Sequence, residues 1–344
     1  MRVGFRDDHV AAADPTASAA SAATPRYRVG LSCVLPCLNE AGNLAVLLPM
    51  LRERLAALCE RWEILVVDDG STDATPALME RWAAVPGMRY VQLSRNFGKE
   101  AALSAGLEAA RGEAVVLMDA DGQHAPELIA EMIERWQAGA DMVYAVRADR
   151  RQESRFKRLG ARWFYRALGA GSVRVPPDAG DFRLLDRRVV RAILAMPERT
   201  RFMKGLYAWV GFRTEAIAYT PAARLRGRSR FGAWRLLRLA ASGLTAFTTW
   251  PLRLVSLVGC AFAALALGYA AYILVDYAMN GNRVSGWTTI VTALLFFAGV
   301  NLVSLGVVGE YVGRIFEEVK GRPLYIVGRR LGRGPFQEPG STRP

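Results

Sequence analysis

The stretch AVVLMDADGQH occupies residues 114–124 and joins an uncharged apolar run to a cluster of polar side chains. The apolar residues 114–118 predict a buried β-strand. Asp119, Asp121 and Gln123 follow at alternate positions, and two carboxylates and an amide just past a strand end can converge on one hard cation. The stretch therefore predicts a Mg²⁺ or Mn²⁺ site that serves a diphosphate, with a solvated Asp-rich turn as the alternative interpretation.

The surrounding sequence alternates between strand-like and helix-like patterns. Leucines at 44, 47, 48, 51, 55 and 58, for example, recur at helical spacing. The predicted strands are 29–35, 63–67, 89–94, 114–118 and 141–145, and the predicted helices are 42–60, a helix that begins at Pro76, and 99–110. This alternation predicts an α/β domain with a mostly parallel sheet covered by helices on both faces. The polar clusters follow the carboxyl ends of the strands, where such sheets bind ligands.

The last third of the chain has a different composition. The chain has 344 residues, of which 52% are hydrophobic, and a formal net charge of +13. No charged residue lies between Arg253 and Asp276 or between Arg283 and Glu310. Each gap exceeds the roughly 20 apolar residues that a helix needs to cross a bilayer, so we expect two transmembrane helices. Two helices buried in a globular core are the alternative.

Basic residues flank the two gaps on the side opposite to the short loop that joins them, namely Arg253, Arg314, Lys320, Arg322, Arg329 and Arg330. The positive-inside rule then places both flanks, and with them Met1 and Pro344, in the cytoplasm. The expected organisation is a disordered tail (1–28) without a signal peptide, a cytoplasmic catalytic domain (29–222), a basic juxtamembrane segment (223–252), two transmembrane helices with a short external loop (253–312) and a cytoplasmic tail (313–344). The cysteines, Cys33, Cys37, Cys59 and Cys260, form no CxxC pair and are expected to be reduced thiols.

Two segments are strongly basic. Residues 147–166 carry eight basic and two acidic residues among apolar residues at helical spacing, which predicts an amphipathic helix for an anionic membrane surface. Residues 224–238 carry six arginines and no acidic residue. Such runs can also neutralise nucleic acid phosphates. Because apolar segments adjoin them, we expect a lipid bilayer as the partner and no nucleic acid.

Several motifs occur together in one order: PCLNE at 36–40, VVDDGSTDAT at 66–75, SRNFGKEAALSAGLEAARGE at 94–113, DADGQHAPE at 119–127, AGDFRLLDRRVV at 179–190 and RLRGRSRF at 224–231. With them the chain resembles family 2 glycosyltransferases, in particular polyprenyl-phosphate sugar transferases of the dolichol-phosphate mannose synthase type and bacterial bactoprenol-phosphate glucosyltransferases. The resemblance implies a GT-A-type nucleotide-sugar-binding domain followed by juxtamembrane amphipathic helices and two transmembrane helices, in the bacterial cytoplasmic membrane. Leu38, Gly122 and Ala125 depart from the usual pattern.

The resemblance also implies roles for individual residues. It implies that the nucleotide is bound by Pro36, Leu38, Glu40, Val67, Asp69, Lys99, Asp119 and Ala120. It implies that Asp119, Asp121 and Gln123 bind the diphosphate and the metal, and that Arg147, Arg224, Ser229 and Arg230 grip the diphosphate or a lipid phosphate. A carboxylate such as Asp69 can accept hydrogen bonds from a base or a ribose.

Some acidic residues have structural alternatives. Asp181 is our candidate for a catalytic base or for a group that orients a sugar hydroxyl, and the alternative is a carboxylate paired with Arg183. For Asp73 we favour helix capping before Pro76. His124 beside the acidic turn is interpreted as a packed or surface residue rather than a metal ligand.

The expected reaction is inverting transfer of a sugar from a nucleoside-diphosphate sugar, with UDP-glucose as the best candidate, to polyprenyl (undecaprenyl) phosphate. A lipid monophosphate has a second pKa of about 6 and is mostly the dianion near pH 7, so it needs positioning more than deprotonation. A processive polysaccharide synthase is disfavoured because the chain has no QxxRW segment. A non-catalytic protein that binds or translocates the lipid carrier would have little use for Asp119 and Asp121. The sequence leaves the oligomeric state open, a homo-oligomer included.

Overall fold

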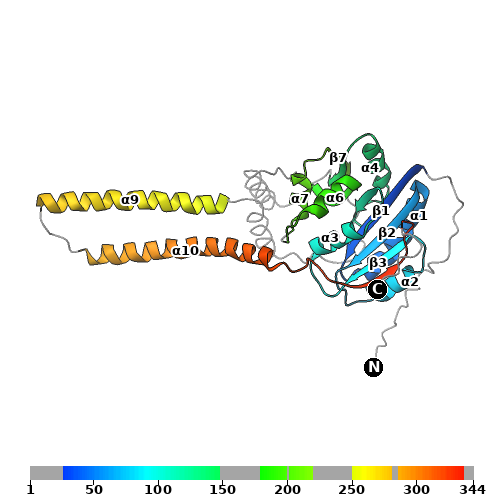
Figure 1. Ribbon diagram of the computed structural model, residues 1–344, viewed down its shortest axis with the longest axis horizontal. Helices are drawn as coiled ribbons and strands as arrows, with labels where there is room; N and C mark the ends of the chain where they lie inside the picture. Colours follow the sequence, from blue (N-terminus) through cyan, green and yellow to red (C-terminus); the bar gives the residue numbers. More distant parts are fainter. Residues whose placement is uncertain (1–25, 148–178, 200, 220–249, 281–285, 337–344) are drawn as a thin grey trace, which may run out of the picture.

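The computed structural model describes residues 26–147, 179–199, 201–219, 250–280 and 286–336. The amphipathic helix expected after Arg147, nearly all of the basic juxtamembrane segment and most of the N-terminal tail lie outside the described residues. The fold is therefore argued from the α/β part, the two long C-terminal helices and the segment that follows them (Figure 1).

The described strands form one sheet with the order β7-β5-β6-β4-β1-β2-β3-β8. The strands are β1 (Tyr27–Cys37), β2 (Cys59–Asp68), β3 (Met88–Leu93), β4 (Ala114–Leu117), β5 (Met142–Arg147), β6 (Ala179–Asp186), β7 (Thr214–Tyr219) and β8 (Val327–Gly332). The central strands β4, β1, β2 and β3 run parallel, as do β5 and β7. Strand β6 is antiparallel to both β4 and β5. The predicted α/β domain with a mostly parallel sheet is confirmed.

Helices cover both faces of the sheet. The described helices are α1 (Ala41–Leu58), α2 (Thr75–Trp82), α3 (Lys99–Ala109), α4 (Leu128–Gln137), α6 (Arg187–Ala195), α7 (Met203–Trp209), α9 (Trp250–Asn280) and α10 (Trp287–Lys320). Successive strand residues point to opposite faces, so Cys33 and Leu35 of β1 pack with α1, α2 and α4, whereas Val34 packs with α3, α6 and α7. The central strands are buried on both faces, which explains their nearly continuous apolar sequences.

Helix α3 packs closely against the sheet at Gly106. A Cβ atom at this position would clash with the Val34 side chain of β1 and lie 3.2 Å from Cγ2 of Val67 in β2. The close approach fixes α3 over the two central parallel strands. Because α3 begins at Lys99, this packing also fixes the position of Lys99 at the carboxyl edge of the sheet.

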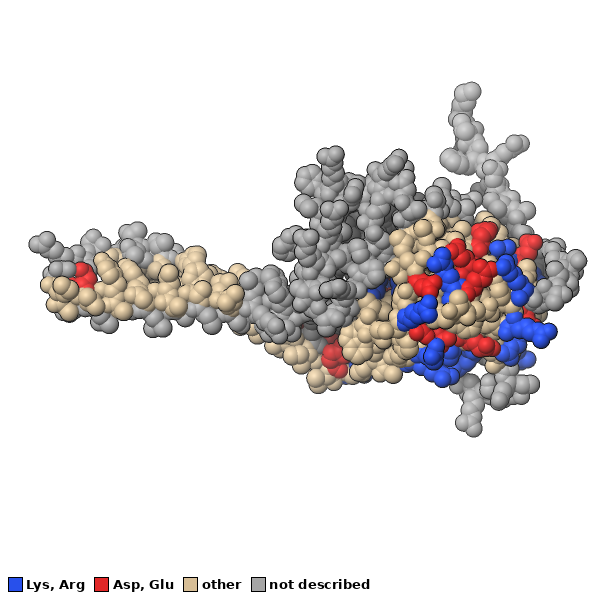
Figure 2. Space-filling model, turned by 90° about the horizontal axis from the view of Figure 1, so that it is seen from above, with Lys and Arg blue, Asp and Glu red and all other residues tan. Residues whose placement is uncertain are grey.

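Helices α9 and α10 lie side by side and project away from the sheet (Figure 1). Within the described residues, one segment, Phe296–Lys320 of α10, is long and apolar enough to cross a membrane, with a mean hydropathy of 1.4. Two long helices are therefore present where two transmembrane helices were predicted. Only α10 contains a described segment with the length and hydropathy of a membrane span, so two spans are not confirmed. Figure 2 shows acidic and basic side chains gathered on the end of the molecule away from this hairpin.

The segment after α10 corrects the expected domain boundaries. Residues 313–344 were assigned to a tail, but β8 within them pairs antiparallel with β3 and completes the sheet, with Leu331 opposite Tyr90. The main-chain N–H of Arg199, after α6, donates to the Glu318 carboxylate near the end of α10 at 2.8 and 3.1 Å. The chain therefore leaves the α/β part before the hairpin and returns to the same sheet after it.

Gly332 at the end of β8 provides a test of this pairing. It has φ +80°, and a Cβ atom there would clash with the Met88 carbonyl oxygen, whereas a Cβ atom at Gly328 in the same strand would approach no closer than 3.4 Å. We expect Gly332→Ala to lower the free energy of unfolding by about 1–3 kcal/mol through strain and overpacking. The matched control Gly328→Ala should change it by less than about 0.5 kcal/mol. Equal melting temperatures for the two variants would contradict the pairing of β8 with β3.

Candidate active site

The predicted polar cluster lies at one edge of the sheet because of the strand directions. β1, β2 and β4 are parallel, so the residues that follow Cys37, Asp68 and Leu117 emerge at the same edge. β6 runs antiparallel to β4, with Arg183 opposite Leu117. The beginning of β6 therefore lies beside the end of β4. This register brings Asp181 next to Asp119, although 62 positions separate them in the sequence.

Lys99 joins these two carboxylates. Its Nζ atom lies 2.6 Å from Asp119 Oδ1 and 2.6 Å from Asp181 Oδ2. The exposed fractions of the three side chains are 43% for Lys99, 30% for Asp119 and 20% for Asp181. Lys99, at the start of α3, thus holds together Asp119, which follows β4, and Asp181 of β6. Asp181 therefore pairs with Lys99 and not with Arg183, the alternative partner. The Arg183 guanidinium donates to the Gly180 carbonyl instead.

The bridge also sets the ionisation of its members. Burial lowers the pKa of Lys99, but the charges of Asp119 and Asp181 outweigh burial and raise that pKa above its usual value. Burial raises the pKa of Asp181, but Lys99 and Lys204 outweigh it and the net pKa is lowered. Near neutral pH a charged Lys99 therefore lies beside a charged Asp181.

The loop from Asp119 to His124 is shaped by local contacts. Gly122 has φ +73°, and the main-chain N–H of Gln123 donates to Asp121 Oδ1 at 3.1 Å. His124 accepts the main-chain N–H of Asp119 at its Nδ1, at 3.2 Å, and its ring stacks on Phe182 with centroids 4.8 Å apart. Burial lowers the pKa of His124, as suits a neutral ring that accepts at Nδ1. The interpretation of His124 as a packed residue is confirmed, but the sequence did not reveal that it holds the Asp119 backbone.

The donor set in this loop fits a hard divalent cation. Asp119, Asp121 and Gln123 offer carboxylate and amide oxygens, which Mg²⁺ and Mn²⁺ favour, and the turn at Gly122 folds the loop that carries them. Among the described residues there is no group of three or more His, Cys, Asp and Glu side chains that could hold a metal. A protein contribution of two carboxylates and one amide would leave coordination positions for substrate oxygens and water, as Mg²⁺ sites usually do.

Asn39 connects the loops after β1 and β2, and the sequence analysis missed it. It has φ +58°, its Oδ1 accepts the main-chain N–H of Thr72 at 2.8 Å, and its own N–H donates to Ser71 Oγ at 2.8 Å. Leu38 beside it is 40% exposed. Glu40 on its other side accepts the Asn43 side-chain amide at 2.6 Å. An asparagine tolerates positive φ better than most residues, and this is the one signal in the sequence that could have identified it.

The predicted nucleotide residues fall into two groups. Leu38 and Glu40 lie in the loop at the site edge, but Pro36, Val67 and Ala120 have buried side chains. Val67 is fully buried and packs under Gly106 of α3. A nucleoside at this edge can therefore meet the main chain of these three residues, but not their side chains.

Asp69 has a structural role in addition to any contact with a nucleotide. Its Oδ1 and Oδ2 accept the main-chain N–H groups of Phe97 and Gly98 at 2.7 and 2.9 Å. Burial raises the pKa of Asp69, and the two hydrogen bonds counteract part of the rise. Since these contacts lie immediately before α3, Asp69 helps to place Lys99.

The neighbouring acidic residues are structural. Asp68 is fully buried and accepts the Tyr90 hydroxyl at 2.6 Å. Asp73 accepts the main-chain N–H of Thr75, the first residue of α2, at 2.9 Å. Asp73 thus satisfies the first main-chain N–H of α2 from the position before Ala74, the N-cap residue of that helix.

The acceptor side is described only in part. Arg147 ends β5, in register with Tyr219 of β7. The predicted phosphate-binding residues Arg224, Ser229 and Arg230 lie outside the described residues.

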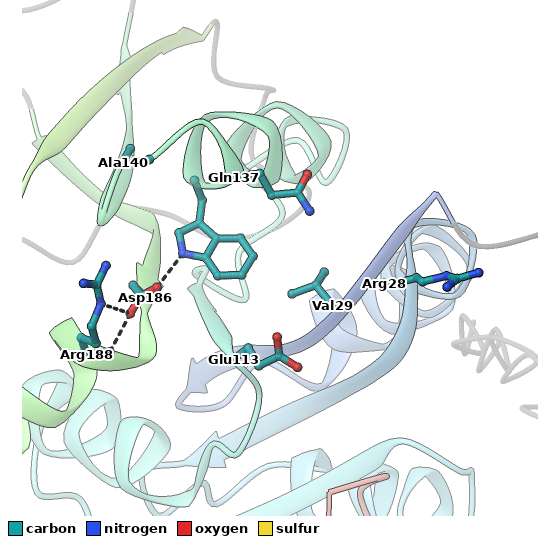
Figure 3. Close-up of a pocket in the computed structure, with 9 residues that line it drawn as sticks. Arg28, Val29, Glu113, Gln137, Ala140, Asp186 and Arg188 are labelled. Carbon is teal, nitrogen blue, oxygen red and sulfur yellow. Dashed lines mark hydrogen bonds and ion pairs between the residues drawn. The ribbon is translucent and has the colours of Figure 1, made fainter.

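A surface pocket of about 330 Å³ lies at the opposite edge of the sheet (Figure 3). Its lining includes Trp136, whose indole N–H donates to Asp186 at the end of β6 at 2.8 Å. It is lined by Arg28, Val29, Glu113, Trp136, Gln137, Gly139, Ala140, Asp186 and Arg188. None of the predicted site residues is among these, so the pocket is separate from the candidate active site.

Comparison with known proteins places the chain in a family. The sequence model of glycosyl transferase family 2 matches residues 32–194. An uncharacterized glycosyltransferase of Synechocystis sp. is 44% identical over 306 residues, which cover 88% of this chain and 96% of that protein. The chain belongs to glycosyl transferase family 2. The SfII prophage-derived bactoprenol glucosyl transferase of Shigella flexneri is 42% identical over 299 residues, which cover 86% of this glycosyltransferase and 97% of that protein.

Two further similarities concern other parts of this family 2 glycosyltransferase and its fold. A model named GtrB C-terminal hairpin matches residues 250–315, which correspond to most of α9 and α10. Among solved structures, mannosyltransferase PcManGT from Pyrobaculum calidifontis in complex with GDP-Man and Mn²⁺ is 19% identical with a TM-score of 0.41, covering 82% of this chain and 88% of that one.

The bridge at Lys99 predicts a pH-dependent loss of stability in Lys99→Met. The lowered pKa of Asp181 contributes stability above its unfolded pKa of about 4, and this contribution is lost as pH falls through the lower folded value. We expect the variant to lose about 1–2 kcal/mol of unfolding free energy near pH 7, a value limited by solvent screening of the half-exposed lysine. The difference from the native protein should shrink below about pH 4.

Thermal unfolding in detergent near pH 7 and below about pH 4 measures the difference in stability between Lys99→Met and the native protein. Arg191→Met, which removes an exposed cation from α6, is the matched control. If Lys99→Met and Arg191→Met have the same stability near pH 7, the bridge does not stabilise the site.

Proposed function

We propose that this family 2 glycosyltransferase transfers a sugar, with inversion, from a nucleoside-diphosphate sugar to polyprenyl phosphate. The observation that carries the proposal is the Lys99 bridge between Asp119 and Asp181, beside the Asp121 loop at the carboxyl edge of a parallel sheet. Relatives named bactoprenol glucosyl transferase, matched over nearly their whole length, support a lipid-linked acceptor. UDP-glucose and undecaprenyl phosphate are the proposed substrates.

The donor would bind at the loops that follow β1, β2 and β4. Leu38, Glu40 and Asp69 would contact the nucleoside, together with the main chain of Pro36, Val67 and Ala120. Asp119, Asp121 and Gln123 would hold Mg²⁺ or Mn²⁺ at the diphosphate. When bound, a divalent cation neutralises diphosphate charge and stabilises the departing nucleotide.

Lys99 would also contact the diphosphate of the donor. Its ammonium group lies between the donor loop and β6. It is therefore suited to contact a diphosphate oxygen while it keeps Asp119 and Asp181 in place. The arginines Arg147, Arg224 and Arg230, with Ser229, are the proposed phosphate contacts on the acceptor side.

The reaction needs little proton transfer from the protein. A phosphate oxygen of the lipid forms a bond to C1 of the sugar while the bond from C1 to the nucleoside diphosphate breaks on the opposite side, which inverts C1. The lipid phosphate is already mostly a dianion near pH 7. Asp181, which is charged and held by Lys99, is therefore assigned to orienting the acceptor or a sugar hydroxyl.

The lipid acceptor requires a membrane arrangement, and we propose that α9 and α10 both cross the bacterial cytoplasmic membrane. The uncharged stretches in both helices and the basic flanks support this arrangement. The pairing of β8 with β3 supports it independently, because the chain before and after the hairpin joins one sheet. The catalytic part and both termini would then be cytoplasmic. A reporter fused after Pro344 that is active only outside the membrane would contradict this topology.

The proposal predicts a specific transfer activity. Detergent-solubilised protein incubated with undecaprenyl phosphate, Mg²⁺ or Mn²⁺ and a panel of sugar nucleotides should give a lipid-linked monosaccharide, identified by mass spectrometry. We expect the largest yield from UDP-glucose. Absence of a lipid-linked product with every donor would contradict the proposed function.

The same assay tests the metal-binding residues. Asp121→Ala should lower the rate at least about a hundredfold, because a transition-state charge contact worth a few kcal/mol is lost. Glu127→Gln is the matched control, since Glu127 is an exposed carboxylate just before α4 whose side chain caps no helix. Near-normal turnover of Asp121→Ala, or full activity in excess EDTA, would contradict the metal site.

A further inference from the structure

Glu100 follows Lys99 in the first turn of α3 and joins α3 to α7. Its side chain is half-buried, and its Oε2 accepts the main-chain N–H of Met203, the first residue of α7, at 3.0 Å. Arg201 makes a second contact to α3 by donating to Ser104 Oγ at 3.3 Å. Met203 itself is fully buried in the core that α3 and α7 share. The residue next to the Lys99 bridge therefore anchors the start of another helix.

Helix α7 in turn shapes the surroundings of Asp181. The positive charge of Lys204 lowers the pKa of Asp181. The Tyr207 ring lies against the Arg183 guanidinium, 3.6 Å from the ring centroid, and both side chains are buried. Within the described part of the chain, the Tyr207 hydroxyl and Arg183 Nε have no hydrogen-bond partner. This buried polar pair lies next to Asp181 on β6, so a shift of α7 would change the environment of Asp181.

We propose that Glu100 is a positioning residue for the transfer reaction: it holds α7 beside Asp181, and its charge state controls how well the site accepts anionic substrates. The inference rests on the proposed function. Glu100 need not touch either substrate, because it acts through Met203 on α7 and through the electrostatic field at Lys99 and Asp181.

The charge of Glu100 changes within the physiological pH range. Burial raises its pKa to about 7, the Asp181 charge adds to the rise, and the hydrogen bond from Met203 opposes it. The charged and titratable groups that surround it are Lys99 on its own helix, Asp181 and Arg183 on β6, and Lys204 and Tyr207 on α7. Below about pH 7 Glu100 is neutral. Above it, an added negative charge faces a site that has to bind a diphosphate and a lipid phosphate.

Two variants of Glu100 separate its charge from its hydrogen bond, and a third variant serves as the control. Glu100→Gln keeps an oxygen that can accept the Met203 N–H and removes the titration, whereas Glu100→Ala removes both. Glu53→Gln is the control, since Glu53 is an exposed carboxylate on α1. The measurement is KM for undecaprenyl phosphate and kcat between about pH 6.5 and 8.5.

We expect KM of the native protein and of Glu53→Gln to rise about three- to tenfold over this range, as an added charge repels the phosphates. Glu100→Gln should keep a nearly constant KM. Glu100→Ala should lower kcat at every pH, because α7 loses its anchor. Parallel KM profiles for the native protein and Glu100→Gln would overturn the proposal.

A second readout requires no activity. A raised carboxyl pKa means that stability is lost as pH rises through the folded value of about 7. The melting temperature of the native protein should therefore fall relative to that of Glu100→Gln between pH 6 and 8. Coincident melting curves would overturn the assignment to Glu100. Lack of transfer by every variant and by the native protein would instead contradict the proposed function, so the two failures are distinguishable.

Discussion

One ammonium group between two carboxylates organises the catalytic edge of this protein. Asp119 follows β4 and Asp181 lies near the start of β6. These two carboxylates would repel each other if Lys99 were not between them. Lys99 can occupy this position because Asp69 holds the chain before α3 and because Gly106 lets α3 lie directly on the sheet. The bridge thus links the loop after β4, the first part of β6 and the start of α3, and a change in any of these elements acts on the other two.

The fold supports this charged edge with contacts some distance from it. His124 stacks on Phe182 and accepts the main-chain N–H of Asp119 in the loop that we propose as the metal site. Asn39 ties together the loops after β1 and β2. After the hairpin the chain returns as β8 and covers the edge of β3, so the segment that follows the hairpin is also part of the sheet. In the membrane arrangement that we propose, two chain connections and not one restrict the orientation of the sheet.

The sequence predicts the central part of this structure well, because the signals there are local. The apolar runs before Asp69 and Asp119 and the leucine spacing of α1 are sufficient to predict the strands, the helices and the edge at which ligands bind. The contacts that depend on long-range register could not be predicted. The Lys99 pair with Asp181 requires β6 to be antiparallel to β4, and β8 is an arginine-containing strand without the alternation that identifies strands. The position of Val67 at a strand end likewise does not reveal that its side chain is buried.

We propose that Asp181 orients an acceptor that is already ionised. The most direct test is the initial rate against pH, between about 5 and 9, at saturating undecaprenyl phosphate, for the native protein and for Asp181→Asn. We expect a lower rate for Asp181→Asn that still rises as pH passes the second pKa of the phosphate, about 6. A folded Asp181→Asn variant whose rate is at background at every pH would instead make Asp181 an obligatory base.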